Sequence, residues 1–260
     1  MILDLASKTQ DQKLSWLRTK KSAMIAKMIA GEKTFDGQED DYHRFIKNSF
    51  SWDFIERPAL DKHLKYLLEG NPKIMDAGCG SGRVIGHLIS LGVSPHKITG
   101  LDENESFLEI AAKEFPRVKF VHSKLETAQI PGRDFDLITC SMVLQHFSER
   151  QLRFTMENFS RWLKPGGHLL YLVSHPGGIS GRPLSSYFDR NLEMIDTPWH
   201  IPVPYYHKTV SDYINQVLRV GLAIEAVEEP EVSPGAREIN PQEYDRYTQK
   251  PNRLVILSVK

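Results

Sequence analysis

The sequence predicts an α/β protein built on a seven-stranded, mainly parallel sheet with helices on both faces. Two observations predict it. From Lys73 onward, short apolar runs alternate with amphipathic helical segments, and a glycine-rich turn joins the first run to a helix. A chain of 260 residues is long enough to bury such a core. The runs expected as strands are 73–77, 98–102, 118–122, 135–140, 167–174, 222–228 and 253–259.

Residues 1–70 are expected to form an N-terminal helical lid ahead of the main domain, residues 71–260. Leu14, Leu17 and Met28 are spaced as one apolar helical face with basic residues around it. Such a helix can lie on a membrane, but packing against its own domain is the commoner use of this pattern. The aromatic-rich segment from Tyr42 to Phe54 then needs a surface to cover, so we expect it to close over a bound ligand.

Two helices have clear start signals. Ser148 and Gln151 form a capping box ahead of an apolar face, and that helix should end before Pro165. Thr209 to Asp212 start a second helix, for which a glycine at position 221 is the expected left-handed end residue.

The alternation of strands and helices breaks between residues 175 and 208. Glycines and prolines mix there with aromatic residues. An ordered loop of this length inside a compact domain is usually functional, so we expect residues 175–208 to form a substrate cap after the fifth strand. Its aromatic residues favour a small, partly flat substrate.

The charge balance disfavours a polyanionic partner. Lysine plus arginine and aspartate plus glutamate each number 33, so no global field draws the chain to nucleic acid or to an anionic membrane. No apolar run approaches the roughly 18 residues needed to span a bilayer, and Asp4 interrupts the apolar N-terminus before a signal peptide forms. We therefore expect a cytoplasmic protein without a membrane span or a nucleic-acid partner, and leave its oligomeric state open.

The two cysteines, Cys79 and Cys140, are too few for a disulfide framework. Both are expected to be free thiols, with Cys79 a small packed residue. No His or Cys spacing suggests a metal site, so we expect no metal.

The glycine-rich turn is the strongest functional signal. The first strand runs into KIMDAGCGSGR, residues 73–83, which places Gly78, Gly80 and Gly82 before a helix. Glycines let the backbone turn sharply there and let a ligand approach N–H groups at the helix N-terminus. The second strand ends in Asp102, whose carboxylate can accept hydrogen bonds from both hydroxyls of a ribose. These features predict a nucleotide-type binding site.

The ordered motifs resemble those of the class I S-adenosylmethionine-dependent methyltransferases, and in particular a bacterial small-molecule type. The matching features are the acidic residue with G-x-G-x-G, the acidic end of the second strand, FDLITCSMVLQHF at the fourth strand and LKPGGHLLYLVSHP at the fifth. The resemblance spans about residues 70–260. It implies a Rossmann-like fold with an antiparallel last strand, S-adenosyl-L-methionine as cofactor, and O-, N- or C-methylation of a small-molecule acceptor.

The resemblance also implies roles for individual residues. Asp76 would bond the methionine amino group, and Asp102 the ribose. Backbone contacts from Leu125 would reach the adenine, since Lys124-Leu125 replaces the common Asp-Ala pair. Ser141 and Met142 would touch the cofactor near the sulfonium. The expected cofactor residues are Asp76, Ala77, Gly78, Cys79, Gly80, Gly82, Arg83, Asp102, Glu103, Leu125, Ser141 and Met142.

Methyl transfer from a sulfonium is an in-line displacement, so positioning the two reactants is the main requirement. For a hydroxyl or phenol acceptor, a general base adds roughly 10²–10⁴-fold. His146 after the fourth strand and His175 after the fifth are the candidate bases. Their alternative roles are a helix-start residue and an anchor of the cap. The candidate substrate contacts are Tyr42, His175, Tyr205, Tyr206 and His207.

Other functions fit part of the pattern. An NAD-dependent oxidoreductase would also use a strand, a glycine turn and Asp102, but the glycine spacing and the later motifs weigh against it. A non-catalytic S-adenosylmethionine-binding protein stays open. A macromolecular methyltransferase is disfavoured, because CSMVLQH differs from an Asn-Pro-Pro-Tyr-like motif and no basic stripe with interleaved aromatics is visible.

Overall fold

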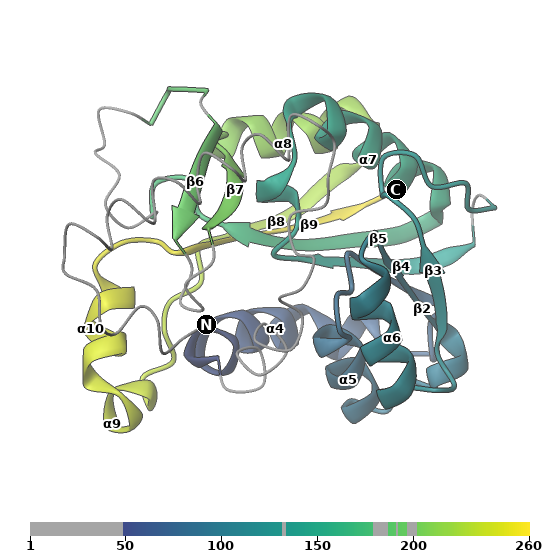
Figure 1. The fold of residues 1–260 in the computed structure, drawn as a ribbon, viewed down its shortest axis with the longest axis horizontal. Helices are drawn as coiled ribbons and strands as arrows, with labels where there is room; N and C mark the ends of the chain where they lie inside the picture. Colours follow the sequence, from purple (N-terminus) through teal and green to yellow (C-terminus); the bar gives the residue numbers. More distant parts are fainter. Residues whose placement is uncertain (1–48, 132–133, 179–186, 191, 197–201) are drawn as a thin grey trace.

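The computed structural model describes residues 49–131, 134–178, 187–190, 192–196 and 202–260. In these ranges the chain forms a seven-stranded sheet of order β3-β2-β1-β4-β5-β9-β8 and a two-stranded sheet of β6 and β7 (Figure 1). Most of the expected lid, including Tyr42, lies outside the described residues.

The large sheet confirms the predicted fold class. Its strands are β1 (Ile74–Ala77), β2 (Ile98–Asp102), β3 (Lys119–His122), β4 (Phe135–Ser141), β5 (Leu163–Ser174), β8 (Ala223–Glu228) and β9 (Arg253–Val259). Strands β1 to β5 are parallel, and β9 runs antiparallel to both β5 and β8. The expected start of the fifth strand at residue 167 was wrong, because Leu163 already pairs with Phe135 of β4.

Helices cover both faces of the sheet (Figure 1). On one face lie α4 (Arg57–Leu67), α5 (Arg83–Ser90) and α6 (Glu105–Glu114), and on the other α7 (Glu149–Trp162) and α8 (Val210–Arg219). The shorter elements are η1 (Trp52–Glu56), which runs directly into α4, then η2 (Pro95–Lys97), η3 (Leu144–His146), α9 (Ala236–Ile239) and α10 (Pro241–Thr248). None of the helices in the described part of the chain is both long and apolar enough to cross a bilayer.

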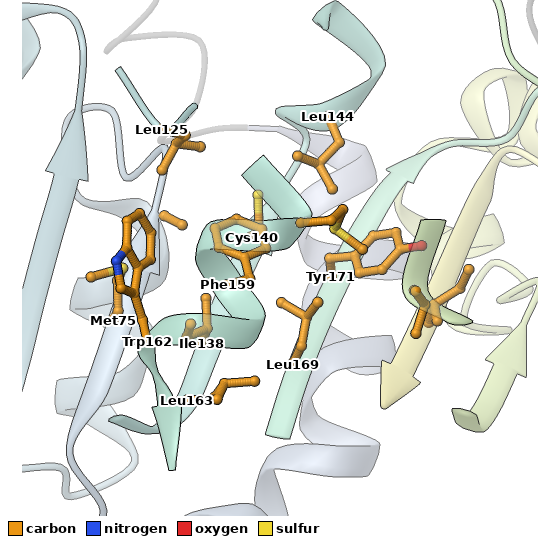
Figure 2. Packing of buried hydrophobic residues seen from close by; sticks show 14 of the residues in the cluster. Met75, Leu125, Ile138, Cys140, Leu144, Phe159, Trp162, Leu163, Leu169 and Tyr171 are labelled. Atoms are coloured by element: carbon orange, nitrogen blue, oxygen red, sulfur yellow. The ribbon is translucent and has the colours of Figure 1, made fainter. Parts of the chain in front are cut away.

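The core has two layers because the central strands are buried on both faces. In β5, Leu169 and Tyr171 pack toward α7, where Phe159 and Trp162 are fully buried (Figure 2). Leu170 points to the opposite layer, against α4, α5 and α6. Successive residues of a central strand face opposite layers, and both layers are apolar. The central strands therefore consist of nearly continuous apolar runs.

Both predicted helix starts are confirmed. Ser148 Oγ accepts the Gln151 N–H at 3.3 Å, and Gln151 Oε1 accepts the Ser148 N–H at 3.1 Å. Thr209 and Asp212 form the same reciprocal pair at the start of α8. Gly221 has a φ of +78°, the left-handed conformation expected after that helix.

The cap contains a β-hairpin that the sequence analysis missed. Strands β6 (Leu192–Asp196) and β7 (Pro202–Tyr206) pair antiparallel, with Met194 opposite Pro204. Prolines 202 and 204 favoured a loop, since proline cannot donate to a strand ladder. In a two-stranded sheet, however, each strand has an open edge where a missing N–H costs nothing, so the hairpin tolerates them.

Candidate cofactor and substrate site

The glycine loop is fixed to the end of β2. The N–H groups of Gly78 and Cys79 both donate to the Leu101 carbonyl, at 2.7 and 3.0 Å. The Gly80 N–H donates to Asp102 Oδ2 at 2.8 Å. The loop after β1 and the candidate ribose-binding carboxylate therefore form one hydrogen-bonded unit.

A backbone N–H two residues after Asp102 also binds its carboxylate. Its Oδ1 accepts the Asn104 N–H at 2.9 Å. Burial raises the pKa of Asp102, while the N–H groups of Asn104, Gly80 and Glu103 oppose that rise. Each carboxylate oxygen has a second lone pair, so the group can still accept ligand hydroxyls. The Glu103 side chain itself is exposed, so Glu103 joins this site through its backbone.

Asp76 has an unsatisfied buried oxygen. The residue is 1% exposed, and its Oδ1 accepts the Thr139 hydroxyl at 2.9 Å. Its Oδ2 has no hydrogen-bond partner among the described residues. Burial, with a further contribution from Asp102, raises the pKa of Asp76 to about 7. A buried carboxylate oxygen without a partner is costly, so this geometry fits an ammonium group such as that of the expected cofactor.

The turn after β4 packs against the glycine loop. A Cβ added at Gly78 would lie 2.4 Å from Cγ2 of Val143, whereas one at Gly80 would meet nothing within 4 Å. Met142 has a φ of +60°, and its N–H donates to the Leu172 carbonyl. The Oγ of Ser141 is buried without a partner among the described residues. The open space at Gly80 and the strained Met142 fit a ligand site, because backbone strain clusters at such sites.

The remaining expected cofactor residues have differing surroundings. Ala77 is fully buried in β1, and Gly82 packs against the Phe115 ring. Leu125 is buried, and its carbonyl already accepts the Asn158 amide at 2.7 Å. An adenine contact at Leu125 would use its N–H or the remaining lone pair of that carbonyl.

Both cysteines are buried and free. Burial raises the pKa of the Cys79 and Cys140 thiols well above the usual range, which disfavours the reactive thiolate. No three His, Cys, Asp or Glu side chains of the described ranges gather as a metal centre would require.

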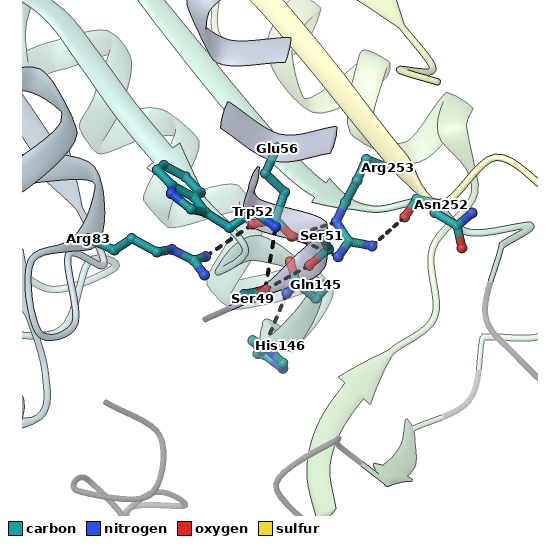
Figure 3. A network of polar contacts seen from close by, with 9 residues as sticks. All are labelled: Ser49, Ser51, Trp52, Glu56, Arg83, Gln145, His146, Asn252 and Arg253. Carbon is teal, nitrogen blue, oxygen red and sulfur yellow. Dashed lines mark hydrogen bonds and ion pairs between the residues drawn. The ribbon is translucent and has the colours of Figure 1, made fainter. Parts of the chain in front are cut away.

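Arg83 extends the site toward a segment that the sequence analysis did not connect with it. Its Nη2 donates to Glu56 Oε2 at 3.1 Å, and its guanidinium lies 4.6 Å from the Trp52 ring centroid (Figure 3). The aromatic richness around Trp52 was a signal that this segment covers a surface. Nothing local in the sequence indicated Glu56, because its partners are distant along the chain.

His146 is held at both ring nitrogens. Its Nδ1 donates to the Pro204 carbonyl of β7 at 2.5 Å, and its Nε2 lies 3.1 Å from the Gln145 amide nitrogen. Burial lowers the pKa of His146 to about 4, opposed by the bond to Pro204 and reinforced by the charge of Lys208. These contacts join the end of β4 to the cap hairpin.

His175 is held by different partners. Its Nδ1 accepts the Gly177 N–H at 3.0 Å, and its Nε2 lies 2.8 Å from Glu229 Oε1. Its backbone N–H donates to the Asn252 carbonyl. Burial lowers the pKa of His175, while Glu229 opposes this. Among the described residues, the hydrogen-bond partners of the His146 ring thus differ from those of the His175 ring.

The cap residues combine buried aromatics with a buried lysine. Tyr205 and His207 are buried with ring centroids 6.3 Å apart, and Tyr206 is half-buried. Lys208, which the sequence analysis passed over, is 4% exposed, and its Nζ donates to the Tyr206 carbonyl at 2.9 Å. Burial lowers the pKa of Lys208 to about 7, with Asp212 and Glu149 opposing. A lysine so placed is suited to an anion or to proton transfer.

Comparisons with known proteins agree with this geometry. Residues 74–167 match the family described as "Methyltransferase domain". The chain is 28% identical over 167 residues to the demethylmenaquinone methyltransferase of Chlorobaculum tepidum, covering 63% of this chain and 64% of that protein. It is 28% identical over 149 residues to the mitochondrial ubiquinone biosynthesis O-methyltransferase of Schizosaccharomyces pombe, covering 50% and 52%. The chain thus spans less than two thirds of these relatives.

A solved structure extends the similarity to nearly the whole described fold. An S-adenosylmethionine-dependent methyltransferase from Mesorhizobium loti superimposes with a TM-score of 0.65 at 26% identity. The match covers 83% of this chain and 100% of that one. The similarity includes the sheet and not only its glycine loop, which favours a methyltransferase over the nicotinamide alternative.

Gly78 and Gly80 should respond differently to alanine. Both have a positive φ, so both variants carry backbone strain, but only Gly78→Ala also collides with Val143. We expect Gly78→Ala to lower the free energy of unfolding by about 1–3 kcal/mol more than Gly80→Ala, as overpacking typically does. Chemical denaturation measures both. Adding Val143→Ala should recover part of the Gly78→Ala loss, and equal losses in the two glycine variants would contradict the packing argument.

In the absence of ligand, the Asp76→Asn variant should gain stability relative to the wild type as pH rises. The folded-state pKa of Asp76 is about 7, against the usual 3.8, so the unfolded chain releases a proton that the folded chain keeps. Stability is therefore lost as pH rises across that window, and asparagine escapes the loss. We expect the advantage of the variant to grow by roughly 2–3 kcal/mol from about pH 5 to about pH 8. Denaturation curves at both pH values test this, and a pH-independent difference would contradict it.

Proposed function

Because the chain carries a class I S-adenosylmethionine-dependent methyltransferase domain, we propose that it methylates a small-molecule acceptor. The observation that supports this most directly is the unsatisfied Asp76 Oδ2 beside the loop that Asp102 holds open at Gly80. One carboxylate suits an ammonium group and the other a pair of ribose hydroxyls. Together they match two parts of one cofactor.

When bound, S-adenosylmethionine supplies an electrophilic methyl group on a positively charged sulfur. The contribution of the chain itself is to hold the cofactor in a fixed position. Asp76 binds the amino end, Asp102 the ribose, and the backbone at Gly80 leaves room between them. Ser141 and Met142, at the end of β4, are the residues we propose beside the reacting centre. Such positioning supplies most of the rate in a reaction of this type.

We propose that the acceptor binds under the β6–β7 hairpin. The Pro204 carbonyl of β7 accepts a hydrogen bond from His146 of η3, which follows β4. The hairpin therefore adjoins the carboxyl edge of the sheet, where α/β proteins bind ligands. Two relatives are named for demethylmenaquinone and for ubiquinone biosynthesis. With the aromatic cap, these names make hydroxylated aromatic rings the first acceptors to test.

Base catalysis by His146 or His175 was the sequence-based proposal, and the contacts favour a positioning role for both. His146 uses Nδ1 on Pro204 and Nε2 on Gln145, and its pKa of about 4 makes it a weak base at neutral pH. His175 accepts the Gly177 N–H at Nδ1, and its Nε2 lies at ion-pair distance from the Glu229 carboxylate. We propose that these histidines fix the cap to the ends of β4 and β5.

The cofactor proposal is tested by binding. We expect calorimetry to show S-adenosylhomocysteine binding, NAD to produce no thermal shift, and Asp102→Ala to weaken S-adenosylhomocysteine by about 1–3 kcal/mol through lost charged hydrogen bonds. Asp245→Ala, at an exposed aspartate of α10, is the matched control and should bind as the wild type does. Undiminished affinity in Asp102→Ala would refute the assigned ribose contact.

Gly80→Val tests the space in the loop separately. A branched side chain at a φ of +53° is strained, and its methyl groups would occupy the open volume that we assign to the cofactor. Its loss of affinity should at least equal that of Asp102→Ala. Circular dichroism must first show that the variant is folded, since a collapsed loop would mimic lost binding.

The histidine roles are tested with a panel of hydroquinone acceptors. If His146 and His175 position the cap, His146→Ala and His175→Ala should raise the apparent KM and lower the melting temperature, with kcat falling far less than the roughly 10²–10⁴-fold expected for a lost base. A kcat loss of that size, together with disappearance of an acidic limb in the pH profile, would instead identify a catalytic base. Lys208→Met tests the third titratable group of this region in the same assay.

A further inference from the structure

A buried ion cluster joins three distant segments around Glu56. Glu56 Oε1 accepts the Arg253 Nε and Nη2 hydrogens at 2.9 and 2.7 Å, and Oε2 accepts from Arg83 at 3.1 Å (Figure 3). Glu56 is only 2% exposed. Burial alone would raise its pKa, but the two guanidinium groups outweigh burial and hold the pKa of Glu56 below its usual value. The carboxylate is therefore ionised.

The cluster carries one uncompensated positive charge, because one carboxylate faces two guanidinium groups. Arg253 spends two nitrogens on Glu56 and a third on the Asn252 carbonyl at 3.0 Å. Arg83 donates one hydrogen bond to Glu56, and its side chain is 17% exposed, so its remaining N–H groups can reach a ligand. The open donors of the cluster thus belong to Arg83.

Arg83 is held rigidly at the edge of the cofactor site. It begins α5 directly after Gly82, and its charge reaches Asp76, where it opposes part of the rise in pKa that burial causes. The Trp52 ring covers its guanidinium at 4.6 Å. Trp52 in turn meets the His87 ring of α5 at 5.7 Å. A stacked and ion-paired guanidinium loses little further freedom when it binds a ligand.

The unsatisfied Asp76 oxygen and the open Arg83 donors form a site of opposite charges. An α-amino acid carries an ammonium and a carboxylate on neighbouring atoms, and a planar guanidinium matches a carboxylate well. On the basis of the function proposed above, we propose that Glu56 is a positioning residue that orients Arg83 to bind the α-carboxylate of the cofactor. The segment before α4 thereby takes part in cofactor recognition.

Two matched ligands isolate this contact. S-adenosylhomocysteine has the α-carboxylate, and its decarboxylated form, S-adenosyl-3-thiopropylamine, keeps the adenosine and the amine but lacks that group. We expect Arg83→Gln to weaken S-adenosylhomocysteine roughly 10- to 100-fold and to leave the decarboxylated ligand within about threefold of wild type. Arg83→Lys, which keeps the charge without the planar fork, should lose an intermediate amount.

Glu56→Gln tests the positioning role. The ratio to compare is the affinity for S-adenosylhomocysteine divided by the affinity for the decarboxylated ligand. We expect Glu56→Gln to lower this ratio by roughly three- to tenfold. In a protein that already carries Arg83→Gln, adding Glu56→Gln should leave the ratio unchanged, because the two residues act through one contact. The ratio does not depend on the folded fraction, so lost stability cannot imitate the effect. If Glu56→Gln does not fold, Glu56→Asp, which draws the charge back from Arg83, replaces it.

The controls separate the alternative outcomes. Arg57→Gln, at the partly exposed arginine that begins α4 next to Glu56, should leave the ratio unchanged. Equal weakening of both ligands in Glu56→Gln would make Glu56 a purely structural residue, and an unchanged ratio in Arg83→Gln would remove the carboxylate contact. Either result overturns the proposal. Wild-type protein that binds neither ligand would refute the proposed function itself.

Discussion

The hydrogen bonds between the glycine loop and the end of β2 are the constraint on which the rest of the site depends. Three successive N–H groups, from Gly78 to Gly80, end on Leu101 and Asp102. Because these donors point at a neighbouring strand, the loop is shaped before any ligand arrives. The same bonds orient the Asp102 carboxylate, and the contact with Val143 carries this order to the turn after β4. Three strand ends thus behave as one rigid edge.

The charges of this edge are arranged for a ligand at some cost to the protein. A carboxylate as deeply buried as Asp76, with one oxygen unsatisfied, destabilises the fold when ionised. The Glu56 cluster has an excess of positive charge, because one carboxylate faces two guanidinium groups. Neither group is explained by packing alone. A ligand that carries both charges would neutralise the Asp76 carboxylate and the excess guanidinium charge. Binding sites of this kind therefore lower the stability of the ligand-free protein.

The outer parts of the site are tied to the sheet through side chains rather than strand pairing. His146 of η3 fastens the hairpin to the turn after β4, and the His175 side chain fastens the end of β5 to Glu229. Glu56 fastens η1 to α5 and β9. Side chains of η1, of η3 and of the residue after β5 therefore connect elements that strand pairing alone leaves apart.

The sequence by itself determined the sheet, both capping boxes and the glycine loop with Asp76 and Asp102. Each of these depends on local periodicity, or on residue types at fixed spacing within one βα unit, so the information is contiguous along the chain. The sequence did not reveal the hairpin, because prolines are uncommon in strands. It also gave no sign that Lys208 is buried. Tertiary structure alone decided which partners occupy His146 and His175, and that Glu56 meets Arg83 and Arg253. Those outcomes depend on side chains up to 197 positions apart, whose charges interact only once folding has removed the water between them.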